Sequence, residues 1–263
     1  MNVFDAHLHI IDPRFPLVPN QGYTPPAFDV ETYRRRVAAL LTDHRPIGGA
    51  VVSGSFQAFD QSYLVTALER LGPRYVGVTQ LPPEVTDAEI LRLDAVGVRA
   101  LRFNLRRGGS ATVRDLRRFA ARIDELAGWH VELYVTGDDL EALEPTLKTL
   151  PRVVVDHLGL RRAGLAALQR LVDHGIQVKA TGFGRLDFDP RPVLRSLADA
   201  APQALLFGTD LPSTRAPRPF EGGDLELLVE ALTPEQAELA LWRNAVTLYR
   251  PAERAETSTT QSA

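Results

Sequence analysis

Cysteine is absent from all 263 residues of the sequence. This absence excludes disulfide bonds, thiolate metal ligands and a cysteine nucleophile, and a chain of this length can bury a core without crosslinks. Lysine is nearly absent too, because Lys148 and Lys179 are the only two and arginine supplies the other basic side chains. Lys179 stands within an apolar stretch, where a charge is rarely left unpaired. Both an internal ion pair and a contact to a substrate are open for it.

Long apolar runs are also missing. No stretch reaches the roughly 18 apolar residues that indicate a membrane-spanning helix. The first residues show neither the basic segment nor the apolar run of a signal peptide. A formal net charge of -3 at pH 7 favours neither nucleic acid nor an acidic partner. We therefore expect a cytoplasmic protein that binds neither membrane nor nucleic acid.

Short apolar runs alternate with amphipathic stretches eight times along the chain. The predicted strands cover about residues 3–10, 48–54, 75–81, 98–104, 130–136, 152–157, 175–182 and 203–209. The predicted helices cover about residues 29–43, 60–71, 85–95, 112–127, 138–149, 161–174, 190–200 and 224–249. This order favours a parallel sheet of the α/β class, and eight such units close into a (β/α)8 TIM barrel. A doubly wound open sheet is the alternative, which the lack of a glycine fingerprint after the first strand disfavours.

We expect a single folded domain. Residues 1–252 carry the barrel pattern, whereas residues 253–263 are small and polar, which is typical of a disordered C-terminal tail. One segment inside the barrel stands apart, because residues 11–28 form a loop rich in proline and aromatic residues. A loop of more than about 15 residues in a compact domain is often functional.

Two histidines lie one residue apart at the end of the first predicted strand. Successive strand residues point to opposite faces, so Asp5, His7 and His9 share one face. Two imidazoles side by side at a strand end can ligate a metal or polarise a carbonyl group. The alternative is a pair of core histidines bonded to the backbone, and the other strand ends decide between these interpretations.

Polar side chains recur at the carboxyl ends of the other predicted strands, which is where (β/α)8 barrels carry their active sites. They are Ser55, Arg102, Asn104, Tyr134, Asp156, His157, Lys179, Arg185 and Asp210. Each alone has an ordinary explanation, since Asp156 can cap a helix or orient a neighbour. Such a set at successive strand ends is unusual for packing alone, so it predicts one site at the barrel mouth. Glu132, on the fifth predicted strand, has no assigned role.

Three motifs at these strand ends, FDAHLHI, VVVDHLG and FGTDLP, resemble those of the amidohydrolase superfamily. The chain resembles in particular the amidohydrolase-2 family, which includes 2-pyrone-4,6-dicarboxylate lactonase and sugar-acid lactonases. The likeness extends over about residues 3–251. It implies a TIM-barrel hydrolase in which His7 and His9 match the strand 1 pair, His157 the strand 6 histidine and Asp210 the strand 8 aspartate.

The chain departs from the metal-dependent members of that superfamily at two positions. Those members usually have a histidine on strand 5 and often a lysine or glutamate on strand 4, where this sequence has Tyr134 and Arg102. Arginine cannot ligate a metal, and its fixed positive charge opposes a nearby cation. We expect either no cofactor or one weakly bound divalent metal, zinc or manganese, with His7, His9 and Asp210 as ligands and His157 available as a fourth.

The resemblance implies a lactonase that opens a carboxylated or sugar-derived lactone by attack of an Asp-activated water. Asp210 is the expected base, and the expected donors to the carbonyl oxygen are His7, His9 and His157. The side chains expected to bind an anionic or polyhydroxylated small molecule are Arg102, Asn104, Tyr134, Ser55, Lys179 and Arg185. Family analogy also suggests a homodimer.

Two other functions fit the same residues. A zinc or manganese ion on His7, His9 and Asp210 would serve a metal-dependent hydrolase, or a decarboxylase of an unsaturated or aromatic acid. A barrel that binds an anion without turning it over is the third hypothesis. The fold alone does not separate these functions.

Overall fold

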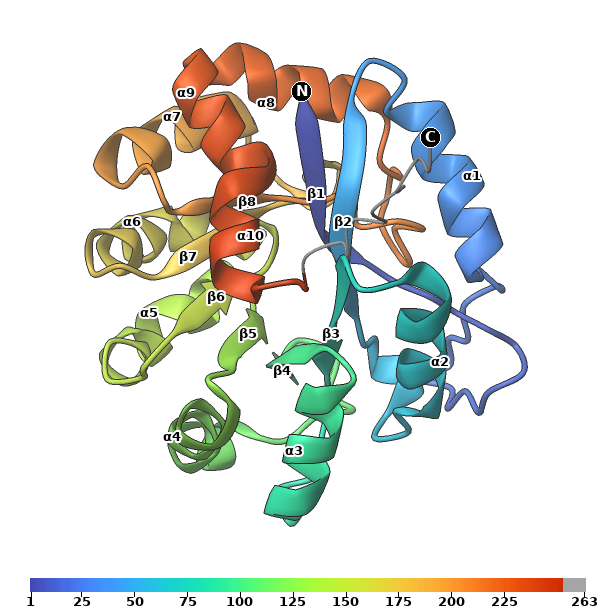
Figure 1. Cartoon of the computed structure of the whole chain (residues 1–263). Coiled ribbons are helices and arrows are strands. Elements are labelled where there is room, and N and C mark those ends of the chain that lie inside the picture. The colour runs from blue at the N-terminus through green and yellow to red at the C-terminus, as the bar shows by residue number, and fades with distance from the viewer. Residues whose placement is uncertain (253–263) are drawn as a thin grey trace, which may run out of the picture.

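The computed structural model describes residues 1–252, and within them eight parallel strands form one sheet that curls into a barrel (Figure 1). The strands pair in sequence order. They are β1 (Asn2–Leu8), β2 (Arg45–Val52), β3 (Tyr75–Thr79), β4 (Val98–Asn104), β5 (His130–Tyr134), β6 (Val153–Val155), β7 (Gln177–Ala180) and β8 (Leu205–Phe207). The expected (β/α)8 TIM barrel is confirmed.

Helices surround the strands on the outside of the barrel (Figure 1). They are α1 (Val30–Leu40), α2 (Ser62–Leu71), α3 (Asp87–Ala95), α4 (Leu116–Ala127), α5 (Gly137–Leu147), α6 (Leu165–Asp173), α7 (Pro190–Ala200), α8 (Gly222–Ala231), α9 (Pro234–Glu238) and α10 (Asn244–Tyr249). Asp29 caps α1 and Thr86 caps α3, because each side chain accepts a backbone N–H of the first turn. In the described part of the chain, no helix has the length and apolar character needed to cross a membrane.

The last helical segment differs from the expected single helix over residues 224–249. Helix α8 ends at Ala231, and Thr233 then caps α9 by accepting the backbone N–H of Gln236. Pro234 begins α9, because proline lacks the N–H that a continuous helix requires but suits the first turn of a new one. A π-helical turn over residues 239–243 joins α9 to α10. The predicted tail, residues 253–263, lies outside the described residues.

Backbone hydrogen bonds join the end of β1 to the segment after β8 and close the barrel. The N–H of Asp210 donates to the carbonyl of His7 at 2.7 Å. The N–H of His9 donates to the carbonyl of Leu211 at 2.8 Å. Closure therefore places the two histidines of the first strand beside the aspartate that follows the last one.

A buried carboxylate strengthens the same junction. Asp5 accepts the backbone N–H and the hydroxyl of Thr209 at 2.8 and 2.7 Å, and the hydroxyl of Tyr33 at 3.1 Å. Burial raises the pKa of Asp5 to about 6, although the hydrogen bonds from Thr209 act in the opposite direction. Asp5 thus closes the barrel and does not line its mouth.

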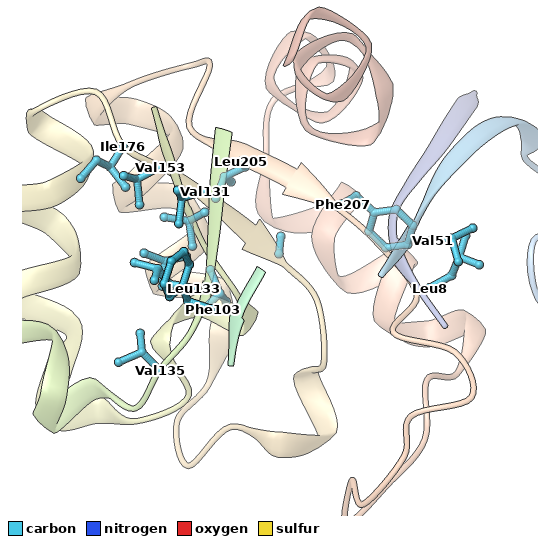
Figure 2. Close-up of a cluster of buried hydrophobic side chains, with 14 of the residues drawn as sticks. Leu8, Val51, Phe103, Val131, Leu133, Val135, Val153, Ile176, Leu205 and Phe207 are labelled. Atoms are coloured by element: carbon cyan, nitrogen blue, oxygen red, sulfur yellow. The ribbon is translucent and has the colours of Figure 1, made fainter. Parts of the chain in front are cut away.

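Apolar side chains pack in two layers. On the outer faces of the strands they pack against the helices, and Figure 2 shows part of this cluster around Leu8, Val51, Phe103, Leu133 and Phe207. A smaller cluster fills the lumen and includes Phe4, Val78, Leu206 and Tyr249. Burying one such side chain contributes about 1.5–3 kcal/mol. Helix α10, seen over the strands in Figure 1, brings Tyr249 into the lumen, where its ring stacks on Phe4 at 5.8 Å.

Gly208 permits the close approach of β8 to β1. A Cβ atom there would lie 2.5 Å from the backbone nitrogen of His7 and 2.9 Å from the side chain of Thr181. Gly208→Ala is therefore expected to lower the free energy of unfolding by about 1–3 kcal/mol, the usual cost of overpacking. Urea denaturation followed by circular dichroism measures the change.

Gly223→Ala is the matched control for Gly208→Ala. A Cβ atom at Gly223, on α8, meets nothing within 4 Å. This substitution should leave stability unchanged or raise it by up to about 1 kcal/mol, because alanine favours a helix over glycine. Equal losses of stability in the two variants would contradict a tight junction at Gly208.

Candidate active site

A cavity opens at the carboxyl ends of the strands. Barrels of this class carry their active sites at this position. Side chains from β4 and β5, and from the segments that follow β1, β2, β4, β6, β7 and β8, line the cavity. Those with polar groups are His9, Ser55, Arg102, Asn104, Arg107, Tyr134, His157, Arg185, Asp210, Thr214 and Arg215.

Three histidine rings converge at the cavity floor. The ring centroid of His7 lies 5.0 Å from that of His9 and 4.8 Å from that of His157. His9 Nδ1 donates to the carbonyl of Val52 at 2.7 Å, and His157 Nδ1 lies 2.7 Å from the hydroxyl of Thr181. Burial lowers the pKa of His7 well below its usual value and that of His157 to about 4. Both of these rings are therefore neutral near pH 7.

Asp210 is the carboxylate beside these rings. Its Oδ2 accepts a hydrogen bond from Arg185 Nε at 2.7 Å. Its buried Oδ1 has no partner among the described residues and lies 3.6 Å from His9 Nε2 and 3.9 Å from His7 Nε2. Burial alone would raise the pKa of Asp210, but Arg185 and the neighbouring histidines hold it well below its usual range. An ionised oxygen thus faces the position of a water or ligand.

A buried ion pair lies behind the histidines. Lys179 Nζ donates to Glu132 Oε2 at 2.5 Å and to His7 Nδ1 at 3.2 Å. The other oxygen of Glu132 accepts from the hydroxyl of Tyr249 and lies 3.2 Å from His130 Nε2. Lys179 is expected from the sequence to bind a substrate or to form an internal ion pair. Its side chain is fully buried and does not line the cavity, so the internal ion pair is the arrangement observed.

Arg102 is held by a second buried carboxylate. Its Nε and Nη2 atoms donate to Asp156 Oδ2 at 3.2 and 2.9 Å, and its Nη1 donates to the carbonyl of Ser53 at 2.8 Å. The side chain of Asp156 caps no helix and instead orients Arg102. Arg102 lines the cavity, but most of its N–H donors already bond to Asp156 and Ser53. Its contact to a substrate stays a prediction.

Two groups of buried side chains in residues 1–252 have spacing that could hold a metal. One is His7, His157 and Asp210, and the other is His7, Glu132 and Asp156. The second group already surrounds the ammonium of Lys179, which lies 2.5 Å from Glu132 and 3.8 Å from Asp156. The first group, beside the cavity, therefore offers the better place for an ion.

The buried charges around the site balance one another. The pairs are Lys179 with Glu132, Arg102 with Asp156, and Arg185 with Asp210. A divalent ion would bring two positive charges into this cluster without a further carboxylate to neutralise them, which carries a high desolvation cost. A tightly bound divalent ion does not fit these residues. The site is compatible with no cofactor or with one weakly bound metal.

Arginines without a carboxylate partner in the described residues lie at the rim of the cavity. Arg215 donates to the side chain and the carbonyl of Asn20, and its guanidinium carbon lies 4.4 Å from the ring centroid of Tyr23. Asn20 Nδ2 in turn donates to the carbonyl of Arg107 at 3.0 Å. Asn20 and Tyr23 belong to the loop over residues 11–28. That long loop therefore holds two cationic side chains over the cavity.

The structure brings the predicted site residues together, but not all of them reach the cavity. His7, Asp156 and Lys179 are fully buried and lie against one another behind the cavity lining, and the other predicted side chains line the cavity. Sequence reasoning missed Arg107, Thr214 and Arg215. Arg215 follows Asp210 by a few residues in the loop after the last strand, and barrels often place site residues in such loops. Its place in this loop was the one feature of the sequence that could have identified Arg215 as a site residue.

A family model described as amidohydrolase matches residues 4–250 of the chain. The chain is 36% identical over 162 residues to a 2-pyrone-4,6-dicarboxylate hydrolase of Comamonas testosteroni. That match covers 59% of this chain and spans about half, 51%, of the relative. The chain is also 28% identical over 259 residues to a 4-sulfomuconolactone hydrolase of Rhizobium radiobacter, a match that covers 89% of this chain and 84% of the relative.

A solved structure from Agrobacterium tumefaciens shares the fold. It superposes with a TM-score of 0.83 at 22% identity, over 96% of this chain and 97% of the other. At this identity the likeness concerns the barrel and says nothing about the reaction.

The metal content of the purified protein tests whether the balanced buried charges disfavour tight binding of a divalent ion. The purified protein is expected to retain no tightly bound ion after dialysis against EDTA, and its Tm should not change, because the buried cluster is already neutral. Mass spectrometry of the dissolved metals and a thermal unfolding curve give the two measurements. One retained ion per chain, with a lower Tm after complete removal, would contradict the charge balance.

Proposed function

Since the chain belongs to the amidohydrolase family, whose model spans residues 4–250, we propose that it is a lactonase that opens a cyclic ester by attack of water. The observation that carries the proposal is the buried Oδ1 of Asp210, 3.9 Å from Nε2 of His7, since neither atom has a hydrogen-bond partner within residues 1–252. A carboxylate and a neutral imidazole at this spacing suit a water molecule and a carbonyl oxygen. Two relatives named as hydrolases of lactones support the same reaction class.

Asp210 is the proposed base. Its Oδ1 takes a proton from a water molecule as the water oxygen attacks the lactone carbonyl carbon. His9 donates its Nδ1 proton to Val52, so in the neutral form of the ring Nε2 accepts hydrogen bonds and suits the orientation of that water. This role replaces the donor role that the sequence suggests for His9.

His7 and His157 are the proposed donors to the oxyanion that forms on the carbonyl oxygen. Both rings are buried and neutral, so each can donate one N–H without a charge that would pair with Asp210 instead. A single donor of this kind typically contributes about 10²–10³-fold to kcat. Together they supply the stabilisation that a metal supplies in other members of the superfamily.

Collapse of the tetrahedral intermediate breaks the ring C–O bond. The proton held by Asp210 passes to the leaving alkoxide, so the products are a hydroxyl group and a carboxylic acid, which then ionises to a carboxylate and releases one proton to the solvent. In the free protein Arg185 holds Oδ2 and keeps the proton affinity of Asp210 low. A substrate carboxylate that draws part of the Arg185 charge would raise the basicity of Oδ1 when the reaction begins.

We propose that the substrate is a small lactone that carries at least one carboxylate. Arg107, Arg185 and Arg215 line the cavity, and guanidinium groups bind carboxylates through paired N–H donors. Asn104 and Tyr134 lie on the same wall and can bind hydroxyl or carbonyl oxygens.

The remaining expectations stay predictions. These are the cytoplasmic location, the homodimer and the absence of a nucleic-acid partner.

A lactone panel tests the proposed function. The panel contains pyrone carboxylates, muconolactones and sugar lactones, and each ring opening releases one proton that a pH indicator detects. We expect turnover of a carboxylated member. Loss of carbon dioxide from an unsaturated acid, with no lactone opened, would favour the decarboxylase, and binding without turnover would favour the non-catalytic barrel.

Asp210→Asn tests the base. The amide cannot take the proton from water, so kcat is expected to fall by about 10²–10⁴-fold, the usual contribution of a general base. Asp138→Asn, an exposed change in the first turn of α5, is the matched control and should keep wild-type kcat. Retained turnover in Asp210→Asn would remove Asp210 from the mechanism.

Arg215→Gln tests whether the arginines at the rim of the cavity bind the carboxylate of the substrate. Loss of one charged hydrogen bond, worth about 1.5–3 kcal/mol, should raise KM for a carboxylated lactone by about 10–100-fold with little change in kcat. Arg117→Gln, an exposed change on α4, is the matched control. An equal effect on an uncharged lactone would contradict carboxylate binding by Arg215.

A further inference from the structure

We propose that Lys179 fixes the proton of His7 on Nε2, so that this ring presents an N–H rather than a lone pair to the substrate. The role rests on the proposed lactonase reaction. Lys179 would be a positioning residue, because it acts through His7 and does not line the cavity. An ammonium group only donates, so His7 Nδ1, 3.2 Å from Nζ, must accept. The single proton of the neutral ring is then on Nε2, the atom that faces Asp210.

The ammonium group of Lys179 is held in place by a buried carboxylate. Lys179 is fully buried, and Glu132 accepts from its Nζ at 2.5 Å. Glu132 is itself held by the Tyr249 hydroxyl and lies beside His130. These contacts leave the ammonium little freedom to move away from His7. Three elements, β5, β7 and α10, therefore combine to present one N–H donor to the ring.

Asp156 would favour the other tautomer of His7, with the proton on Nδ1. Its Oδ1 lies 3.4 Å from His7 Nδ1 and has no hydrogen-bond partner within residues 1–252. Without the ammonium, Nδ1 would carry the proton and donate to Asp156, and Nε2 would present its lone pair to the cavity. A carboxylate behind the ring in this way is typical of metal-ligating histidines. The partner of Nδ1, Lys179 or Asp156, thus decides whether His7 is a donor or a metal ligand.

His9 provides an internal contrast. Its Nδ1 donates to the carbonyl of Val52, so its Nε2 carries the lone pair in the neutral form of the ring. As neutral rings, the two histidines of the HxH motif therefore take opposite tautomers, one suited to the carbonyl oxygen and the other to the attacking water. A motif that elsewhere supplies two equivalent metal ligands is divided here into a donor and an acceptor.

Nuclear magnetic resonance of the wild-type protein tests the tautomer directly. Long-range ¹H–¹⁵N correlation spectra of protein labelled with ¹⁵N-histidine distinguish Nδ1–H from Nε2–H rings. His7 is expected as Nε2–H and His9 as Nδ1–H, and loss of signals in His7→Gln identifies the His7 ring. An Nδ1–H ring at His7 would overturn the proposal whatever the activity.

Lys179→Met removes the ammonium with little change in volume. The His7 ring should change to Nδ1–H, and kcat should fall by about 10²–10³-fold, the loss of one oxyanion donor, with KM close to wild type. Lys148→Met, at the only other lysine, is the matched control, since Lys148 pairs with Glu144 away from the cavity. Its tautomers, kcat and KM should be those of the wild type.

Zinc binding gives a readout that does not depend on lactone hydrolysis. Calorimetric titration with Zn²⁺ should show higher affinity in Lys179→Met than in the wild type, because Nε2 gains a lone pair and one positive charge is removed. If this variant does not fold, the double variant Lys179→Met/Glu132→Gln removes both charges of the buried pair. It should show the same Nδ1–H ring at His7 and the same raised zinc affinity.

The outcomes separate the two proposals. A folded variant with unchanged His7 tautomer and unchanged zinc affinity overturns the role of Lys179. A changed tautomer and raised zinc affinity, in a protein whose wild type opens no lactone, support the role of Lys179 and reject the lactonase.

Discussion

The hydrogen bond from the Asp210 amide to the His7 carbonyl sets the distance between the two ends of the site. Each other strand pairs with its sequence neighbour, whereas this junction joins residues from the start and the end of the barrel. Asp5 and Thr209 reinforce it, and Gly208 leaves room for it. Since a displacement of about 1 Å between reacting groups can lower a rate about 10²-fold, the packing of β8 on β1 is a condition for chemistry at this mouth.

Paired charges surround the histidines, and only the pair of Lys179 and Glu132 lies wholly behind the cavity lining. Lys179, Arg102 and Arg185 are each held by a carboxylate, so their positive ends keep fixed positions in a region of low dielectric. Fixed dipoles and charges of this kind stabilise a developing oxyanion without having to reorganise during the reaction. The three buried ion pairs therefore place fixed charges beside the histidines while adding no net charge to the site.

Much of the fold and part of the site could be predicted from the sequence, because both follow local rules. Alternation between apolar strands and amphipathic helices predicts the barrel, and strand ends predict which side chains reach its mouth. The partners of these side chains could not be predicted in this way. Lys179 meets Glu132 from 47 positions away, and their distance depends on the curvature of the closed sheet. The tautomer of His9 likewise depends on a carbonyl of another strand, and the restart of the helix at Pro234 overrides a continuous helical pattern.

Helix α10, near the end of the described residues, supports His7, which lies near their beginning. Its Tyr249 bonds the same carboxylate, Glu132, that anchors Lys179 against His7. The electrostatic setting of His7 therefore needs residues from both ends of the barrel sequence. During synthesis on the ribosome, the strands that carry the histidines and arginines emerge well before this helix does. A chain cut before α10 would hold the cavity residues and still lack the contact of Tyr249 with Glu132, so the support of the site depends on a helix that lines none of the cavity.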